Sequence, residues 1–271
     1  MATQSALINV MQKASIAASR GMLRDFGEVE NLQVSRKGPA DFVSRADVNA
    51  ERTIRRELEK ARPDWGFLME ESGSTAGATD DAPTWIVDPL DGTTNFLHGI
   101  PQFAISIAVL EKSPQGADVI TAGSIYDPTR NEFFFAEKGK GAFMNERRLR
   151  VSGRRTMPDS LFSTGIPFLG RGTSDDHQRF LGELSRVMAV SSGVRRGGSA
   201  ALDLAWLAAG RYDGFWERGL AKWDIAAGIL LVREAGGFVS DFASRDRAFA
   251  TGDIVAGNPT IHTELLKTLR A

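Results

Sequence analysis

The stretch WIVDPLDGTT, residues 85–94, contains the transition that decides the fold. Its three apolar residues predict a buried strand, which ends where proline and glycine interrupt the pattern. Asp88 and Asp91 follow directly, and Gly92 precedes two threonines that open a helix. Aspartates at such a point commonly form a turn or cap a helix. Carboxylates beside unpaired backbone amides also suit Mg²⁺ and phosphate, so this stretch alone leaves both interpretations open.

Composition excludes several classes of site. The chain has 271 residues, 42% of them hydrophobic, which is enough for one large domain or two packed halves. A formal net charge of -1 gives no overall field that would attract nucleic acid or an anionic membrane. The absence of cysteine excludes disulfides, thiol nucleophiles and cysteine-bound metals, and it fits a reducing compartment. His98, His177 and His262 are far apart in sequence, which argues against a histidine-rich metal site.

Neither a membrane span nor a transit peptide is the favoured interpretation of the apolar segments. The longest apolar runs, residues 103–110 and 225–232, are far too short to cross a bilayer. The first 26 residues are rich in serine and contain no acid before Asp25, as in a transit peptide. Their apolar residues recur at steps of three and four, however, and we therefore expect a first amphipathic helix.

The order of elements changes along the chain. The first half reads as helices followed by strands with short loops, which predicts an antiparallel sheet. Its helices are expected near 4–24 and 46–61, and its strands at 84–88, 103–111, 118–126, 132–136 and 142–151. From about residue 155 helices and strands alternate, which predicts an α/β half. Here strands are expected at 161–165, 212–216, 237–241 and 252–256, and helices at 174–188, 199–209, 223–235 and 259–269.

Acidic residues also stand at the ends of two other predicted elements. Glu70 and Glu71 follow an apolar pair that resembles a strand end, although adjacent glutamates usually lie on a solvated surface. Asp224 begins an apolar helix, where an acid is favoured by the helix dipole. Each position has an ordinary explanation by itself. Three acidic positions at element ends, in a chain with few histidines, together indicate metal-dependent phosphate chemistry.

Several segments resemble one known family. MEES (69–72), WIVDPLDGTTNF (85–96) and WDIAAG (223–228) resemble signature segments of the inositol monophosphatase family. The similarity extends from KGPADFVSRAD (37–47) to IVAGNP (254–259), and RRGGSAALDLAWLAAGRYDGFWERG (195–219) is similar to the bacterial members. The resemblance implies a layered αβαβα sandwich of the α/β class, as in inositol monophosphatases and fructose-1,6-bisphosphatases. We expect an antiparallel-sheet half at 1–151 and an α/β half at 152–271, whose facing ends form the site.

The resemblance implies two or three Mg²⁺ ions. The first would be held by Glu70, Asp88 and the main-chain carbonyl of Leu90, and the second by Asp88, Asp91 and Asp224, with Asp88 bridging. Glu70 would also contribute to a third, more weakly held ion. One position departs from the family, because Met69 stands where a glycine usually precedes the two glutamates.

The family's catalytic and substrate contacts carry over to further residues. Thr93 matches the threonine that orients the attacking water, together with an aspartate that corresponds to Asp47. Gly92 and Thr93 would offer backbone amides to the phosphate, while Gly198, Ser199, Ala200 and Glu217 match contacts to the inositol hydroxyls. Alternatives for the last group are a helix cap at Ser199 and a surface acid at Glu217.

The resemblance therefore implies a Mg²⁺-dependent phosphomonoesterase that acts on inositol 1-phosphate and similar small polyol phosphates, as a cytoplasmic homodimer. Fructose-1,6-bisphosphatase and 3′-phosphoadenosine 5′-phosphate phosphatase activities are alternatives. The nucleotide 3′-phosphatases tend to have Lys-Glu in place of Thr94-Asn95, and the fructose-bisphosphatases Ser-Ser in place of Thr93-Thr94. Both alternatives are therefore disfavoured as the main activity.

A binding role is an alternative of a different class, because bacterial relatives act with the transcription and RNA-processing machinery. Five arginines at positions 147, 148, 150, 154 and 155, and the pair Arg195-Arg196, could form such a contact. A solvated surface or a subunit interface explains them equally simply.

Overall fold

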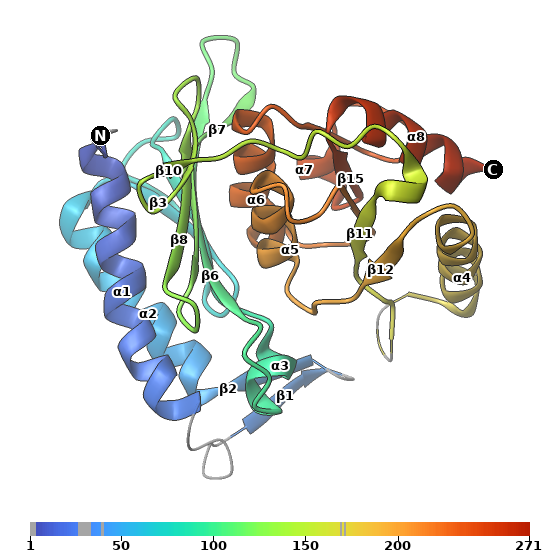
Figure 1. The fold of residues 1–271 in the computed structure, drawn as a ribbon. Coiled ribbons are helices and arrows are strands. Elements are labelled where there is room, and N and C mark those ends of the chain that lie inside the picture. The colour runs from blue at the N-terminus through green and yellow to red at the C-terminus, as the bar shows by residue number, and fades with distance from the viewer. Residues whose placement is uncertain (1–3, 27–33, 39–40, 169, 171) are drawn as a thin grey trace.

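Helices and sheets alternate in layers, as the sequence predicts (Figure 1). The computed structural model describes residues 4–26, 34–38, 41–168, 170 and 172–271, with the backbone alone at 34–38 and 41–44. Pro39 and Ala40, within the segment that resembles the family, lie outside the described residues. An outer pair of helices covers the larger sheet, a middle pair lies between the sheets, and a second outer pair covers the smaller sheet.

The larger sheet has eight strands and is antiparallel except for one parallel pair, β3 with β5. In spatial order it contains β10 (Arg147–Arg148), β9 (Gly141–Met144), β8 (Glu132–Glu137), β7 (Asp118–Asp127), β6 (Ala104–Lys112), β5 (Thr84–Asp91), β3 (Gly66–Met69) and β4 (Gly73–Thr75). The outer helices on this sheet are α1 (Ala6–Phe26) and α2 (Arg45–Ala61). A separate two-stranded sheet, β1 (Val34–Gly38) with β2 (Asp41–Ser44), precedes α2.

Residue size differs between the two faces of the larger sheet. Along β6, Ile105, Ile107 and Val109 face α1 and α2, because side chains alternate along a strand. The opposite face carries small residues, and at Gly123 of β7 a Cβ atom would lie 2.9 Å from the Cα of Ala227. The small residues therefore allow the middle helix layer to approach the sheet closely.

The middle layer consists of α5 (Ala200–Ala208) and α6 (Lys222–Glu234). Most of their residues are buried, as expected for helices covered by a sheet on each side. The two helices contact each other through Gly228, where a Cβ atom would lie 2.6 Å from the Cβ of Leu204. This close contact fixes α6, which carries Asp224 at its start, relative to α5, which begins after Ser199.

The smaller sheet has five strands and is also mixed. Its order is β12 (Gly193–Arg195), β11 (Leu161–Thr164), β13 (Gly214–Glu217), β15 (Ile254–Gly257) and β14 (Phe238–Ser240). The outer helices α4 (Ser174–Met188) and α8 (Pro259–Arg270) enclose a third apolar core against it. The remaining elements are α3 (Thr93–Leu97), α7 (Ala248–Thr251) and the 3₁₀ turn η2 (Met157–Asp159).

Two predicted strands are wrong in their extent. The strand expected at 84–88 continues past Pro89 to Asp91. The sequence pattern predicts a continuous strand over 142–151, but β9 and β10 are separate strands joined by a tight turn. Asn145 in that turn has a φ of 52°, a left-handed conformation that asparagine tolerates better than most residues. The larger sheet therefore ends in a short hairpin. Among the helices of the described residues, none is long and apolar enough to span a membrane.

Candidate active site

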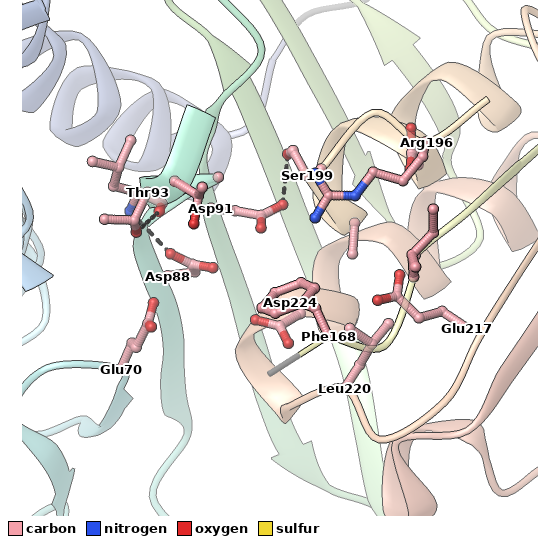
Figure 2. Close-up of a pocket in the computed structure, with 18 residues that line it drawn as sticks. Glu70, Asp88, Asp91, Thr93, Phe168, Arg196, Ser199, Glu217, Leu220 and Asp224 are labelled. Atoms are coloured by element: carbon pink, nitrogen blue, oxygen red, sulfur yellow. Dashed lines mark hydrogen bonds between the residues drawn. The ribbon is translucent and has the colours of Figure 1, made fainter. Parts of the chain in front are cut away.

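One pocket brings together five of the acidic residues singled out in the sequence, Glu70, Asp88, Asp91, Glu217 and Asp224 (Figure 2). On one side the pocket is lined by residues at the ends of β3 and β5 and at the start of α3. On the other side it is lined by residues at the starts of α5 and α6 and at the end of β13. Its lining includes Glu70, Asp88, Leu90, Asp91, Gly92, Thr93, Gly198, Ser199, Ala200, Glu217 and Asp224. Asp47 does not line the pocket but is buried behind Thr93.

An irregularity in β5 directs two aspartates to the same side. Residues three apart in a regular strand point to opposite faces. The pairing with β6 shifts register between Asp88 and Asp91, next to Pro89, which has no amide proton to donate. Asp88 is buried, and its Oδ1 accepts a hydrogen bond from the backbone N of Leu90 at 2.9 Å. Both carboxylates consequently reach the pocket.

Gly92 allows the chain to turn from β5 into α3. It has a φ of 101°, and a Cβ atom there would lie 2.9 Å from the carbonyl oxygen of Gln102. A residue with a side chain would be strained in this conformation and would also collide with the neighbouring backbone. The turn places Gly92, Thr93 and Thr94 in the pocket lining, and the first backbone amides of a helix have no partner within it.

The carboxylates repel one another. Burial raises the pKa of Asp88 well above its ordinary value, and the negative charges of Glu70, Asp91 and Asp224 raise it further. A cluster of this kind is stabilised by protons or by a cation. All of the donors are oxygen atoms, which Mg²⁺ prefers, so the residues fit the ion that the sequence implies.

Two of the candidate ligands are already oriented by helix ends. Oδ2 of Asp91 accepts hydrogen bonds from the Ser199 hydroxyl at 2.6 Å and from the Ala201 backbone N at 2.7 Å. Oδ2 of Asp224 accepts one from the backbone N of Ala221 at 2.8 Å. In the part of the chain that the structure describes, no three acidic or histidine side chains converge closely enough to hold an ion in their present positions.

Ser199 has the role of a helix cap. Its hydroxyl accepts a hydrogen bond from the backbone N of Leu202 at 3.3 Å, and it donates to Asp91. The capping interpretation is thus confirmed, and the contact of Ser199 with a substrate hydroxyl stays a prediction. Glu217, at the end of β13, is half-buried and faces the pocket.

Thr93 and Asp47 are in contact, although 46 positions separate them in sequence. Oγ1 of Thr93 lies 3.1 Å from Oδ1 of Asp47 and 3.1 Å from the carbonyl oxygen of Leu90. The hydroxyl has one proton, which it can donate fully to only one of these acceptors. Donation to Asp47 leaves the Leu90 carbonyl available to a metal and leaves Oγ1 able to accept a hydrogen bond from water.

The residues beside Glu70 point elsewhere. Met69, the departure from the family pattern, is buried among the apolar residues between α1, α2 and the larger sheet. The methionine side chain therefore packs in the core. The backbone N of Glu71 donates to Oε2 of Glu51 at 2.9 Å, and Glu71 does not line the pocket.

Seven pocket residues were not predicted as site residues from the sequence, and Phe168, Arg196 and Asp203 are those among them with an aromatic or charged side chain. Asp203 is buried in α5, and its Oδ1 has no hydrogen-bond partner among the described residues. Burial raises its pKa well above the ordinary value, as do the charges of Glu217 and Asp91, while Arg196 opposes the shift. An aspartate within the apolar run AALDLAWLAA was the available signal for Asp203.

Known proteins are similar to this chain over nearly its whole length. The chain is 59% identical to the inositol-1-monophosphatase of Mesorhizobium japonicum, over 98% of this chain and 97% of that protein. It is 42% identical to the Nus factor SuhB of Escherichia coli, over 97% of this chain and 96% of that protein. The crystal structure of the extragenic suppressor protein suhB from Bartonella henselae superimposes with a TM-score of 0.92 at 55% identity, covering 98% of this chain and 99% of the other. A sequence model of the inositol monophosphatase family matches residues 3–271, and the chain belongs to this family.

Proposed function

We propose that this phosphoric monoester hydrolase releases phosphate from inositol 1-phosphate, with water as the nucleophile and Mg²⁺ as the cofactor. The observation that carries the proposal is the convergence of Glu70, Asp88, Asp91 and Asp224 on one pocket beside the start of α3. Identity of 51–59% to three proteins named inositol-1-monophosphatase supports the choice of substrate.

In this proposal the four carboxylates and the Leu90 carbonyl hold the metal. Asp88 is placed between Glu70 on one side and Asp91 on the other, which suits a bridging ligand (Figure 2). Bound Mg²⁺ would supply positive charge against the phosphate and a water of lowered pKa. The backbone amides of Gly92 and Thr93 would donate hydrogen bonds to the phosphate oxygens.

Thr93 and Asp47 would orient the attacking water. Asp47 accepts the hydroxyl proton of Thr93, and a lone pair of Oγ1 then accepts a proton of the water. A water that donates this proton keeps its lone pairs, and one of them would be available to attack phosphorus. Asp47 is buried in α2, which keeps the acceptor of the Thr93 hydroxyl away from bulk water.

The alcohol half of the substrate would contact Gly198, Ser199, Ala200 and Glu217. All four line the pocket, and Ser199 and Glu217 lie across it from Glu70 and Thr93 (Figure 2). Glu217 can accept hydrogen bonds from hydroxyl groups, which favours a polyol over an apolar alcohol.

The test is phosphate release from inositol 1-phosphate by the purified protein, with Mg²⁺ and with a chelator. We expect turnover only with Mg²⁺, and a fall in kcat of about 100-fold or more in Glu70→Gln and Asp91→Asn, because each removes a charged ligand. Glu71→Gln is the matched control, since Glu71 is adjacent but outside the pocket. Near-full activity of Glu70→Gln would show that the site is assigned wrongly.

A binding role with transcription machinery is a second candidate, because relatives at 42% identity are named Nus factor SuhB. The arginines at 147, 148, 150, 154 and 155 are exposed, which a partner contact requires but an ordinary solvated surface also explains. Fructose-1,6-bisphosphate and 3′-phosphoadenosine 5′-phosphate remain candidates for secondary substrates. The homodimer, the cytoplasmic location and the number of bound ions also remain predictions.

A further inference from the structure

Arg196 is the single basic side chain among the described residues that line the pocket. The same lining contains six acids, Glu70, Asp88, Asp91, Asp203, Glu217 and Asp224. Four of these are the proposed metal ligands, which leaves Asp203 and Glu217 as the acids near the alcohol half of the substrate. A lone cation in this part of the pocket affects which leaving groups can enter it.

The guanidinium of Arg196 is folded back over the loop that precedes α5. Its Nη1 lies 2.8 Å from the position that a Cβ atom of Gly198 would occupy, and its Cζ lies 5.7 Å from the centre of the Phe168 ring. On the other side of the loop, a Cβ atom at Gly197 would lie 2.7 Å from Oδ1 of Asp203. Two glycines therefore let a cation and a buried carboxylate approach the same loop, and their opposite charges attract.

The hydrogen-bond donors of Arg196 are not used within the described residues. Its side chain is exposed, and apart from the ring contact with Phe168 and the attraction to Asp203 it makes no ion pair or hydrogen bond there. A guanidinium has five N–H donors in a planar fork. The adjacent Arg195 differs, because its Nη1 donates to the Val194 carbonyl at 3.2 Å and it does not line the pocket.

The position of Arg196 assigns it to the leaving group and not to the transferred phosphate. Figure 2 shows its side chain on the side of Ser199 and Glu217, across the pocket from Glu70, Asp88 and Thr93. Any group that Arg196 contacts would therefore belong to the alcohol half of the substrate.

We infer that Arg196 is a specificity-determining residue that binds a second phosphate on the alcohol half of the substrate. The inference rests on the proposed function and extends it from polyol monophosphates to polyol bisphosphates. A phosphate accepts two parallel hydrogen bonds from a guanidinium, whereas a hydroxyl group does not match both. Without this cation, the Glu217 carboxylate would leave the same region with no positive charge and would repel a second phosphate.

The test compares inositol 1-phosphate with inositol 1,4-bisphosphate, which differ in one phosphate. Both are measured with Mg²⁺ in the unmodified protein, Arg196→Ala, Arg196→Lys and Arg195→Ala. We expect Arg196→Ala to lower kcat/KM for the bisphosphate about 10-fold more than for the monophosphate, with Arg196→Lys intermediate. Arg195→Ala is the matched control and should change both values by less than about 2-fold. Calorimetric titration with the bisphosphate measures its Kd for each variant and so compares the variants independently of turnover.

Two results would overturn the inference. An equal loss for both substrates in Arg196→Ala would show that the arginine only shapes the loop before α5, and no loss for either would show that it is an ordinary surface residue. Failure of the proposed function is distinguishable, because the unmodified protein would then not hydrolyse inositol 1-phosphate, while titration would still report the effect of Arg196 on bisphosphate binding.

Discussion

Thr93 is the residue at which the proposed chemistry depends on a single proton. Its hydroxyl must donate to Asp47 for Oγ1 to accept a hydrogen bond from water, and the structure offers Leu90 as a competing acceptor at the same distance of 3.1 Å. Asp47 is buried in the first turn of α2, and a carboxylate is a stronger acceptor than a backbone carbonyl. The orientation of water thus depends on a contact between residues from two elements.

Two replacements of Thr93 by residues of similar size distinguish the contribution of its hydroxyl to kcat from the contribution of its shape. Thr93→Val retains the shape but has no hydroxyl, and we expect kcat to fall about 100-fold, the usual contribution of a positioned proton-transfer group. Thr93→Ser retains the hydroxyl and is expected to stay within about 10-fold of the parent. Steady-state kinetics on inositol 1-phosphate measure both. Equal kcat values for the two variants would remove Thr93 from the mechanism.

At the residue scale, the sequence predicted the acids better than their neighbours. Asp91 ends β5, Asp224 lies in the first turn of α6, and Asp88 precedes the proline of β5, so each stands where the residue pattern of the sequence changes. Arg195 and Arg196 are indistinguishable by type and position, and only the fold of the loop brings one of them into the pocket. Asp203 was missed because its environment is created by tertiary contacts.

At the scale of elements, the position of α6 controls the position of Asp224. This helix packs against α5 through Gly228 and against β7 through Gly123, with no space for a Cβ atom at either contact. Its long apolar run and its terminal glycines predicted the helix within one residue at each end. The three-residue strand β12 and the four-residue helix α7 are too short to show a periodicity, so the sequence did not reveal them.

The close contact at Gly228 can be tested with one methyl group. In Gly228→Ala the new Cβ would lie 2.5 Å from Cδ1 of Leu204, and overpacking of this kind typically costs about 1–3 kcal/mol of unfolding free energy. Gly21→Ala is the matched control, because Gly21 also lies within a helix but has no neighbouring atom within 4 Å. The control should gain about 0.5–1 kcal/mol from helix propensity. Urea unfolding measures both, and equal gains would contradict the close packing of α5 and α6.

At the scale of the whole molecule, the pocket joins parts of the chain that belong to different layers. Glu70 and Asp88 extend from the larger sheet, whereas Asp224 begins a helix of the middle layer and Glu217 ends a strand of the smaller sheet. Mutual repulsion of these carboxylates acts against the packing of the layers. A bound cation would convert the same contacts into favourable ones, which couples metal binding to the stability of the fold.

This coupling predicts how stability depends on pH and on Mg²⁺. The raised pKa of Asp88 means that the folded state holds a proton that the unfolded state releases, so metal-free stability falls as pH rises from the ordinary value of 3.8 through the raised pKa. Mg²⁺ binds the deprotonated carboxylates, and its stabilising effect should grow over the same pH interval, to about 2.7 kcal/mol at a concentration of 100 times Kd.

Asp88→Asn removes the repulsion but retains an oxygen that can accept a hydrogen bond from the Leu90 backbone N. We therefore expect this variant to be inactive, insensitive to Mg²⁺, and more stable than the parent at pH 8 in a chelator, by roughly 1–2 kcal/mol. Thermal unfolding of both proteins at pH 5 and pH 8, with Mg²⁺ and with a chelator, measures the pH dependence of stability and the stabilisation by Mg²⁺. A variant less stable than the parent in the chelator at pH 8 would show that Asp88 is held by favourable contacts and not by a charge that a metal must neutralise.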